Sequence, residues 1–309
     1  LSERFKLHMF KSRLATGVVV RRCYRNTTVR SKRRRGAAAE TILGERGSSV
    51  CVYELQGSLF FSTMEQVLRQ VTQELDSFTY LIFDFKRVLQ LDECARVLLA
   101  QTDEMLKRCG KTLLLAHLAE DRADSCEPSG RSGFFADIDS ALEWCEDQLL
   151  QQEQPEFLRE TPQVPFAAMD ILAGFDHRET TLIESIAEEM RCAPGATIVR
   201  EGDRADSLYL LAAGRVSICL RINDGARRQR LSTLSPGLAF GDVALLDGGT
   251  RSADVIADEP TRCYVLPFAK LQTLAVSHPE VYSRLIGNIG RELSARLRRA
   301  DAEIRSLAD

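Results

Sequence analysis

The first half of the chain alternates strand-like apolar runs with stripes of helical periodicity. The runs that read as buried strands lie at 50–55, 80–85 and 112–116. Between them, apolar residues recur every three to four positions over 62–75 and 92–109, as on one face of an amphipathic helix. A further stripe over 138–150 predicts a closing helix. Strands that alternate with helices in this way predict a small α/β domain, with a mixed sheet and helices packed against it.

Local signals place the ends of these elements. Gly57 predicts a turn between the first strand and a short second strand that ends at Phe61. Ser62 or Thr63 is expected to cap the first helix, and Asp92 the second. The reason is that short polar side chains accept hydrogen bonds from the free N–H groups at the start of a helix.

The second half of the chain has short apolar runs interrupted by Gly, Asp and Pro. These runs lie at 195–203, 206–218, 231–234 and 263–266. Such spacing is typical of a small antiparallel barrel or roll. A helix broken at Gly174 is expected over 168–191, and a long helix over 279–307. The residues 151–165 between the two halves are polar and contain three prolines, which predicts a semi-rigid linker.

The long C-terminal helix carries an apolar stripe at four-residue spacing. Its members are Leu285, Ile289, Leu293 and Leu297. Two interpretations remain open: the stripe packs on the roll as a hinge helix beside a ligand, or it joins two copies of the chain in a short coiled coil. The opposite face is rich in arginine, which is most simply a face exposed to solvent.

The charge of the chain is unevenly distributed. Residues 1–35 contain twelve Lys and Arg against one acid, a net charge of +11, so that the rest of the chain carries −14 of the total of −3. Such a basic arm can bind nucleic acid or an anionic membrane surface, and its simplest state is solvated and partly disordered. We therefore divide the chain into a basic arm (1–45), an α/β domain (46–150), a linker (151–165) and a roll domain (166–309).

The nine cysteines are scattered, and none forms a Cys-x-x-Cys pair. This spacing predicts neither a disulfide framework nor a metal site, and it favours a reducing compartment. The four histidines are equally far apart, and we expect them on the surface or on helices. No apolar run is long enough to cross a bilayer, and no signal peptide is recognisable. Because the chain begins with Leu1, we expect it to be a piece of a longer protein.

One segment of the second half carries the candidate chemistry. A glycine and an acid precede one apolar helical turn, and a Gly-Gly turn then leads to an arginine and two small residues. Free N–H groups at the start of a helix attract a phosphate. Arg251 can add a forked, charge-assisted contact to the same anion, and Asp242 can accept hydrogen bonds from sugar hydroxyls. The candidate binding residues are Phe240, Gly241, Asp242, Val243, Ala244, Arg251, Ser252 and Ala253.

This segment resembles the phosphate-binding cassette of the cyclic nucleotide-binding domain, whose pattern is Phe-Gly-Glu, a short apolar helix and Arg-Ser/Ala-Ala. The flanking runs over 195–218 resemble the same family, and the resemblance covers 166–309. It implies an α+β fold, a β-roll with flanking helices, and cAMP or cGMP as the ligand, without a metal. It also implies that Arg251 holds the cyclic phosphate and Asp242 the ribose 2′-hydroxyl. Asp stands where the family usually has Glu, which keeps the charge but shortens the reach by one methylene.

The segment 55–63 reads Leu-Gln-Gly-Ser-Leu-Phe-Phe-Ser-Thr and resembles the STAS domain in the subtype attached to SulP anion transporters. That resemblance covers about 18–150 and implies the α/β STAS fold. Cys94 stands where related anti-sigma factor antagonists carry a phosphorylated serine, and a thiol excludes that phosphorylation. A redox role remains open for Cys94 at a helix N-terminus, but we expect it to be a small buried residue.

The two resemblances together imply a non-catalytic regulatory region of a SulP-type sulfate or anion transporter. Cyclic nucleotide binding would move the C-terminal helix and act on the STAS domain. The fragment itself would be soluble, on the cytoplasmic side of the membrane, with residues 1–35 near the anionic membrane surface. The expected partners are the transporter membrane domain and a second copy of the chain. DNA is not expected, because no helix-turn-helix follows the last helix.

Two alternatives belong to other classes. The same pair of domains can regulate a glutaminase-type enzyme, whose catalytic part would precede Leu1. Alternatively, the Asp in place of Glu at 242 suits a degenerate interaction scaffold that binds no nucleotide. The residues before Leu1 discriminate the transporter from the glutaminase, and calorimetry with cAMP and cGMP tests the non-binding scaffold.

Overall fold

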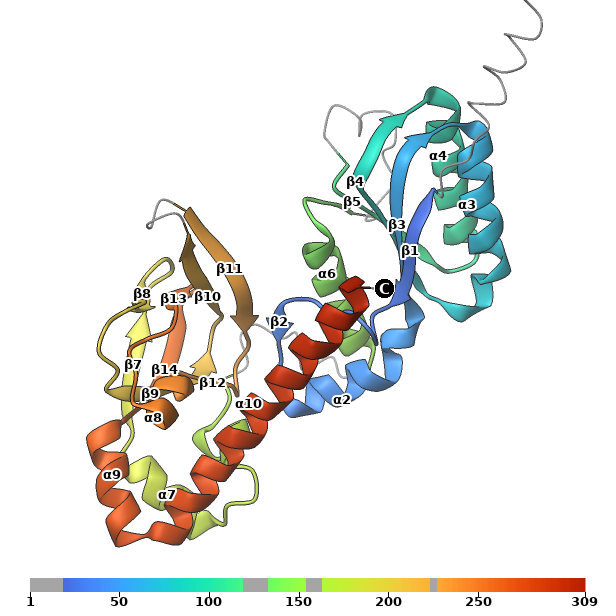
Figure 1. Ribbon diagram of the computed structural model, residues 1–309. Helices are drawn as coiled ribbons and strands as arrows, with labels where there is room; N and C mark the ends of the chain where they lie inside the picture. The colour runs from blue at the N-terminus through green and yellow to red at the C-terminus, as the bar shows by residue number, and fades with distance from the viewer. Residues whose placement is uncertain (1–18, 119–132, 154–162, 223–226, 309) are drawn as a thin grey trace, which may run out of the picture. The chain divides into compact units, whose positions relative to one another are not determined.

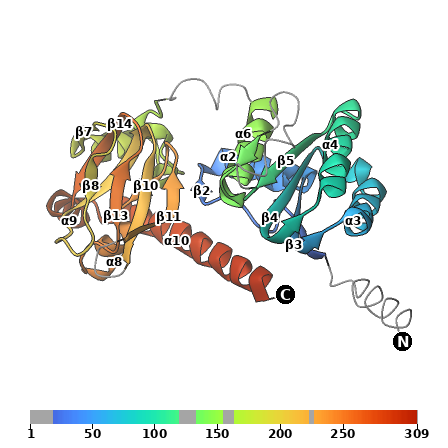
Figure 2. The same cartoon turned by 90° about the horizontal axis from the view of Figure 1, so that it is seen from above.

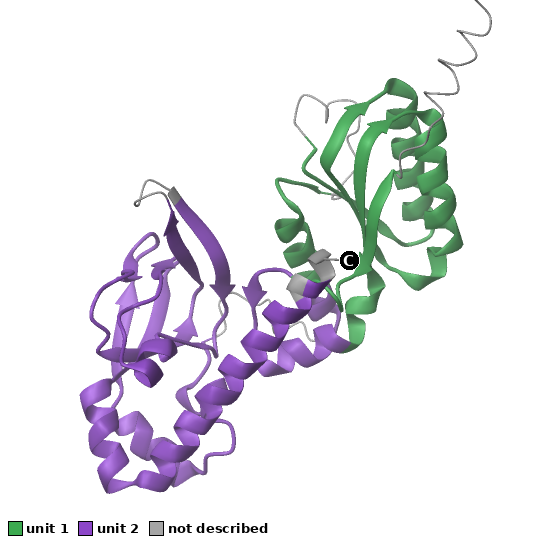
Figure 3. Ribbon diagram, viewed as in Figure 1, with its two compact units in different colours: residues 1–30, 45–148 green, residues 31–44, 149–309 purple. Residues whose placement is uncertain are grey.

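The chain forms two compact units, shown in Figure 3, and each is described by itself. The computed structural model describes residues 19–118, 133–153, 163–222 and 227–308. The first unit comprises residues up to 30 together with 45–148, and the second comprises 31–44 together with 149 onwards. Residues 1–18 of the expected basic arm and 154–162 of the expected linker lie outside the described residues.

The first unit is a five-stranded sheet covered by helices on both faces (Figures 1 and 2). The strand order is β1-β3-β4-β5-β6, in which β1 is antiparallel to β3 and all other pairs are parallel. The strands are β1 (Val20–Arg25), β3 (Val50–Leu59), β4 (Tyr80–Leu91), β5 (Thr112–Ala116) and β6 (Phe134–Phe135). The helices are α3 (Phe61–Gln73), α4 (Glu93–Arg108) and α6 (Ile138–Glu153). This mixed sheet confirms the α/β prediction.

Side chains alternate along the strands, so apolar residues are buried on both faces of this sheet. One side of β3, with Cys51, Tyr53 and Leu55, packs in the core cluster that includes Met64 of α3 and Leu99 of α4. On the other face, Trp144 of α6 makes an edge contact with Tyr80, with ring centroids 5.8 Å apart. A strand buried on both faces needs apolar residues at every position, which is why these runs could be read from the sequence.

Two boundaries of the first unit differ from the sequence prediction. Strand β3 does not end at Gly57 but continues to Leu59, because it stays paired with β4 through that residue; the φ of +76° at Gly57 accompanies a register shift within the strand. Helix α3 begins at Phe61, so neither Ser62 nor Thr63 is its cap; instead the Thr63 hydroxyl accepts a hydrogen bond from the Phe60 N–H at 2.8 Å. The Asp92 cap of α4 is confirmed by a 2.7 Å hydrogen bond from the Ala95 N–H.

The second unit is a roll of two sheets flanked by helices. One sheet has the order β2-β11-β10-β13-β8, and the other β12-β9-β14-β7. Their bounds are β2 (Arg33–Arg34), β7 (Glu188–Cys192), β8 (Thr197–Val199), β9 (Ser207–Ala213), β10 (Val216–Ile222), β11 (Arg227–Leu234), β12 (Ala239–Phe240), β13 (Asp254–Ala257) and β14 (Thr261–Pro267). The helices are α2 (Ala37–Arg46), α7 (His177–Ser185), α8 (Asp242–Asp247), α9 (Phe268–Ser277) and α10 (Pro279–Ala308). The predicted β-roll with flanking helices is confirmed.

The helix expected over 168–191 is only partly present: the break at Gly174 and a helix after it are confirmed, but the residues on either side are not α-helical. The segment instead forms two 3-10 turns (Phe166–Ala168 and Asp170–Leu172), then α7, then strand β7. Gly174 has a φ of +82° and ends the first part, and Asp176 starts a new helix through a capping box with Glu179. Strand β7 forms because it pairs with β14, a partner far away in the sequence. Tertiary pairing therefore outweighs helical propensity here.

The end of the expected basic arm belongs to the second unit. Strand β2 pairs in parallel with β11, so that Arg33 lies opposite Thr233. The Arg33 Nε donates to the Ser235 hydroxyl at 3.0 Å, and the Ala37 N–H at the start of α2 donates to Asp170 at 2.9 Å. Burial raises the pKa of the Asp170 carboxyl, although the Ala37 hydrogen bond opposes this effect. A solvated, partly disordered arm is therefore the wrong description of these residues.

Helix α10 packs on the core of the second unit along most of its apolar stripe. Leu285 and Ile289 are fully buried, Leu293 is partly buried in the same core, and Leu297 is 64% exposed. The interpretation that the stripe packs on the roll is therefore confirmed as far as Leu293. In the part of the chain that the structure describes, no helix is both long and apolar enough to cross a bilayer.

Candidate functional site

The six-residue helix α8 lies between two glycines in the left-handed conformation. Gly241 precedes it with a φ of +82°, and Gly248 follows it with a φ of +69°. A Cβ atom on Gly241 would lie 2.5 Å from Nη1 of Arg251 and 3.2 Å from the carbonyl oxygen of Ser207. Gly241 is therefore required both by its backbone angle and by the close approach of the arginine. This approach brings the two ends of the predicted cassette together.

Arg251 is buried, with only 5% of its surface exposed. Its Nη2 donates to the carbonyl oxygen of Ser207 at 2.8 Å, and its Nη1 donates to the carbonyl oxygen of Gly241 at 3.4 Å. The guanidinium carbon also lies 5.4 Å from the ring centroid of Tyr209 and 5.9 Å from that of Phe268. These contacts fix the plane of the guanidinium, and rings flanking a cation favour it through their quadrupoles.

The charge of Arg251 lacks an effective counter-charge on the protein. The nearest carboxylate is Asp206, 3.5 Å away, whose side chain is 78% exposed and therefore well screened by solvent. Among the described residues, no hydrogen-bond acceptor contacts the Nε of Arg251. A buried cation is costly unless an anion pairs with it. The geometry therefore suits a small anion, and a phosphate can accept the forked donors of the guanidinium.

Asp242 is equally buried, with 3% of its surface exposed, but it already has a charged partner. Nη2 of Arg296, from α10, lies 2.9 Å from Oδ2, and Nη1 lies 3.3 Å from Oδ1. Burial lowers the pKa of the Arg296 guanidinium, but the charges of Asp242 and Glu292 outweigh this effect and raise it. The expectation that the arginines of α10 simply face solvent is therefore wrong for Arg296.

The ion pair continues away from the cassette. Oε1 of Glu292 lies 2.9 Å from Nη2 of Arg296 and 2.6 Å from Nη2 of Arg34, on strand β2. Burial, and then the neighbouring Arg296 charge, lowers the pKa of Arg34, and Glu292 opposes both. One turn further along α10, Arg299 pairs with Glu40 of α2 at 3.0 Å. The chain of ion pairs from Asp242 through Arg296 and Glu292 to Arg34 thus joins the cassette to the segment 31–44, which lies in the sequence between the two parts of the first unit.

The remaining predicted residues have different environments. Phe240 is 2% exposed and stacks on Tyr209, with ring centroids 4.9 Å apart, so it packs against the ring that lies beside Arg251. Ala244 and Ala253 are buried at 5% and 7% exposure and pack the cassette against the roll. Val243 is 39% exposed, and Ser252 is also exposed. Of the predicted residues, the buried polar ones are Asp242 and Arg251.

Sequence reasoning missed Asp254, which supports the cassette from its C-terminal side. This carboxylate is fully buried, accepts a hydrogen bond from the Glu201 N–H at 2.8 Å and pairs with Arg221 at 2.8 Å. The hydrogen bond from Arg221 lowers the pKa of Asp254 against its burial. The turn that Asp254 holds includes Gly202, whose N–H donates to the carbonyl oxygen of Arg251 at 2.8 Å. An acid inside the apolar run after the cassette was the available signal.

In the first unit, the structure corrects one expectation. Cys94 is exposed at the second residue of α4, so it is not the small buried residue that we expected. Cys94 follows the Asp92 cap by two residues, so it lies at the predicted start of the helix. The redox role of Cys94 stays a hypothesis.

Two family models match separate parts of the chain. Residues 43–143 match the STAS domain, and residues 189–278 match the cyclic nucleotide-binding domain. The second match includes α8, Asp242 and Arg251, but it ends before α10 and therefore before Arg296. The two matches correspond to the mixed sheet and to the roll described above.

Similarity to curated proteins extends over nearly the whole chain. Glutaminase 2 of Bradyrhizobium diazoefficiens is 33% identical over 98% of this chain, and Glutaminase 1 of the same organism is 29% identical over 98%. The chain spans about half of the length of each glutaminase, 49% in both cases. The Cyclic AMP receptor protein of Thermus thermophilus is 34% identical over 42% of this chain and 58% of its own. The chain therefore consists of a STAS domain followed by a cyclic nucleotide-binding domain.

Proposed function

We propose that this chain is the cyclic-nucleotide-responsive regulatory region of a glutaminase-type enzyme. The observation that carries the ligand part of this proposal is the buried Arg251, which lies near two aromatic rings. Among the described residues, its one ion-pair partner is the exposed Asp206. The enzyme part is supported by similarity to two glutaminases along nearly the full chain. In this proposal the catalytic residues belong to the other half of the protein.

The proposed ligand is cAMP or cGMP, bound with its cyclic phosphate at Arg251. A phosphate oxygen would accept from the guanidinium, with Gly241 leaving room for the close approach. The ribose hydroxyl would donate to Asp242, which now faces Arg296. The ribose hydroxyl and Arg296 would therefore compete for the same carboxylate of Asp242.

This competition supplies a route from the ligand to the first unit. If the ribose displaces Arg296, the contacts of Glu292 with Arg296 and Arg34 rearrange as well. Arg34 lies on β2, and the chain runs from there through α2 and a 3-10 turn (Gly47–Ser49) into β3 of the first unit. The two states would be those with and without the Asp242–Arg296 ion pair. A ligand shifts the equilibrium between them only as far as it binds one state more tightly than the other, and here that difference would be set by the free energy of the displaced ion pair.

Calorimetry with each nucleotide tests the ligand part of the proposal. We expect binding by the unmodified chain, and Arg251→Ala should weaken it roughly 30-fold or more, the effect of about 2 kcal/mol for a truncated buried charge pair. Arg284→Ala is the matched control, because Arg284 pairs with Glu179 away from the cassette and is 42% exposed. Absence of heat with both nucleotides at high micromolar concentration would instead support the non-binding scaffold.

A SulP-type anion transporter is the second candidate for the whole protein. It is supported by the net charge of +11 in residues 1–35, which suits an anionic membrane surface, and by the STAS domain itself. The two candidates differ in what precedes Leu1 in the full protein: several long apolar helices in a transporter, or a domain with a nucleophilic serine in a glutaminase. Glutamine hydrolysis by the purified full-length protein would decide for the enzyme.

Two partners remain proposals. A second copy of the chain would pack against the exposed end of α10, where Leu297 is 64% exposed. Sedimentation of the chain and of Leu297→Lys tests this proposal, because a charge in that stripe disfavours association. Binding to vesicles with and without anionic lipid tests whether the basic arm contacts a membrane surface.

A further inference from the structure

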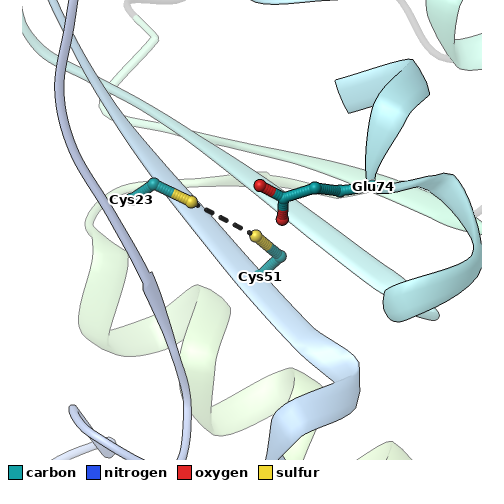
Figure 4. A group of neighbouring side chains, drawn as sticks. All are labelled: Cys23, Cys51 and Glu74. Carbon is teal, nitrogen blue, oxygen red and sulfur yellow. Dashed lines mark hydrogen bonds between the residues drawn. The ribbon is translucent and has the colours of Figure 1, made fainter. Parts of the chain in front are cut away.

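Three side chains with metal-binding atoms converge in the first unit, far along the sequence from one another. The Sγ atoms of Cys23 on β1 and Cys51 on β3 lie 3.7 Å apart. A carboxylate oxygen of Glu74, the residue that follows α3, lies within 4.8 Å of both sulfur atoms. Figure 4 shows all three side chains directed toward a common point. The cluster is separate from the cassette, which belongs to the second unit.

The sheet register decides between two uses of the paired thiols. Cys23 lies opposite Tyr53, and Arg25 opposite Cys51, so the two cysteines are diagonal neighbours on one face. Diagonal neighbours have Cα atoms about 7–8 Å apart. A disulfide usually needs a Cα separation of about 4.4–6.8 Å, so this register favours a bridge longer than one S–S bond.

A metal ion provides a bridge of the required length. Zinc binds thiolate sulfur at about 2.3 Å in tetrahedral geometry, which places two sulfur ligands of one ion about 3.8 Å apart. The observed separation of 3.7 Å between Cys23 and Cys51 agrees with this value. We propose that Cys23, Cys51 and Glu74 bind a thiophilic divalent ion, Zn²⁺, whose fourth position is open to water.

The surroundings balance the charge of such an ion. Two thiolates and one carboxylate carry three negative charges, which Zn²⁺ and the guanidinium of Arg25 neutralise together. Nη2 of Arg25 lies 2.6 Å from Oε2 of Glu74 and donates to the Ser77 hydroxyl at 2.8 Å. Arg25 thus orients the carboxylate and leaves Oε1 of Glu74 as the ligand atom, the arrangement by which outer residues support metal ligands.

The site is open to an ion from one side. Zinc binds thiolates, so both thiols release their protons to solvent when the ion binds. Cys23 is exposed and Cys51 is buried, so the ion can enter from the solvent side. The bound ion would then fasten the edge strand β1 to the end of α3.

Titration of the reduced full chain with Zn²⁺ and Co²⁺ tests this proposal. We expect one high-affinity ion per chain and, with Co²⁺, a thiolate-to-cobalt charge-transfer band. Cys23→Ser should abolish the band. Glu74→Gln removes a charged ligand, so it should weaken binding by at least the roughly tenfold loss known for residues that only support a ligand. Both positions are at least partly exposed, so neither variant opens a hole in the core.

The matched control is the double variant Cys94→Ser/Cys109→Ser, since both thiols are exposed and lie on or next to α4. The control should bind the ion as the unmodified chain does, and this result supports the proposal. Three results overturn it: no ion bound by the reduced chain, full binding by Cys23→Ser, or loss of binding in the control.

Discussion

The cassette of the second unit and the thiol cluster of the first are specified in opposite ways. The cassette takes its glycine, its acid and its arginine from the single stretch 240–253, with Asp242 and Arg251 nine positions apart. The thiol cluster takes one residue each from β1, β3 and the end of α3. A local site can be read from a pattern of residues, whereas a cluster from three elements exists only when the sheet register is known.

The cassette itself is only partly encoded by one segment of the sequence. Its acid pairs with Arg296 on α10, and Glu292 extends that network to Arg34 on β2. The half of the cassette that we propose for the anion therefore comes from one segment. The half that we propose for the sugar also depends on α10 and β2, which come from distant parts of the chain.

The largest expected effect tests the local half. Gly241→Ala should destabilise the second unit by about 3 kcal/mol and remove nucleotide binding, because it combines a left-handed backbone with a Cβ 2.5 Å from Arg251. Gly248→Ala is the matched control: its φ is +69°, but nothing lies within 4 Å of its added Cβ. It should cost only about 1 kcal/mol. Urea unfolding measures both, and equal losses would mean that the close approach of Arg251 is unimportant.

The next effect tests the cluster assembled from distant residues. Zn²⁺ at about 100 times its dissociation constant should stabilise the first unit by about 2.7 kcal/mol, because the ion binds the folded state only. The measurement is the Tm of the first unit with and without the ion, in the chain and in Cys23→Ser. An equal rise in both proteins would place the ion elsewhere.

A smaller effect is expected for the ion pair between the cassette and α10. Arg296→Ala should destabilise the nucleotide-free second unit by about 2 kcal/mol, because the buried Asp242 loses its counter-charge. The same variant should bind cyclic nucleotide roughly tenfold more tightly, since about 1.4 kcal/mol of competing interaction is removed. Arg299→Ala, which breaks an exposed ion pair with Glu40, is the control. Weaker binding by Arg296→Ala would mean that Arg296 contacts the ligand and does not compete with it.

The smallest effect tests the end of the network. Arg34→Ala should cost about 1 kcal/mol, because Arg34 is partly buried and pairs with Glu292 at 2.6 Å. In a double-mutant cycle with Arg296→Ala, the two losses should not add, since both arginines share one carboxylate. Hydrogen exchange at residues 31–36 should also increase when nucleotide is added to the unmodified chain. Additive losses and unchanged exchange would remove this route of coupling.

Most elements of the fold could be predicted because their signals are local. The Asp92 cap, the core strand at 112–116 and the long helix from Pro279 agree with the structure. The error over 168–191 arose because β7 owes its strand conformation to β14, and the error at Gly57 arose because β3 stays paired with β4 through that residue. In both cases hydrogen bonds to a partner strand outweigh the local preference.

The sequence by itself determined the order of the two domains, the segment that carries the cassette and the glycine beside which Arg251 lies. These properties follow from backbone angles and residue types within short segments, which no distant contact needs to complete. Only the tertiary structure decided that Arg296 faces Asp242, that β2 belongs to the second unit and that Cys23 meets Cys51. Each of these depends on which strands pair and which helix face is buried, and that choice is made by the free energy of the whole unit.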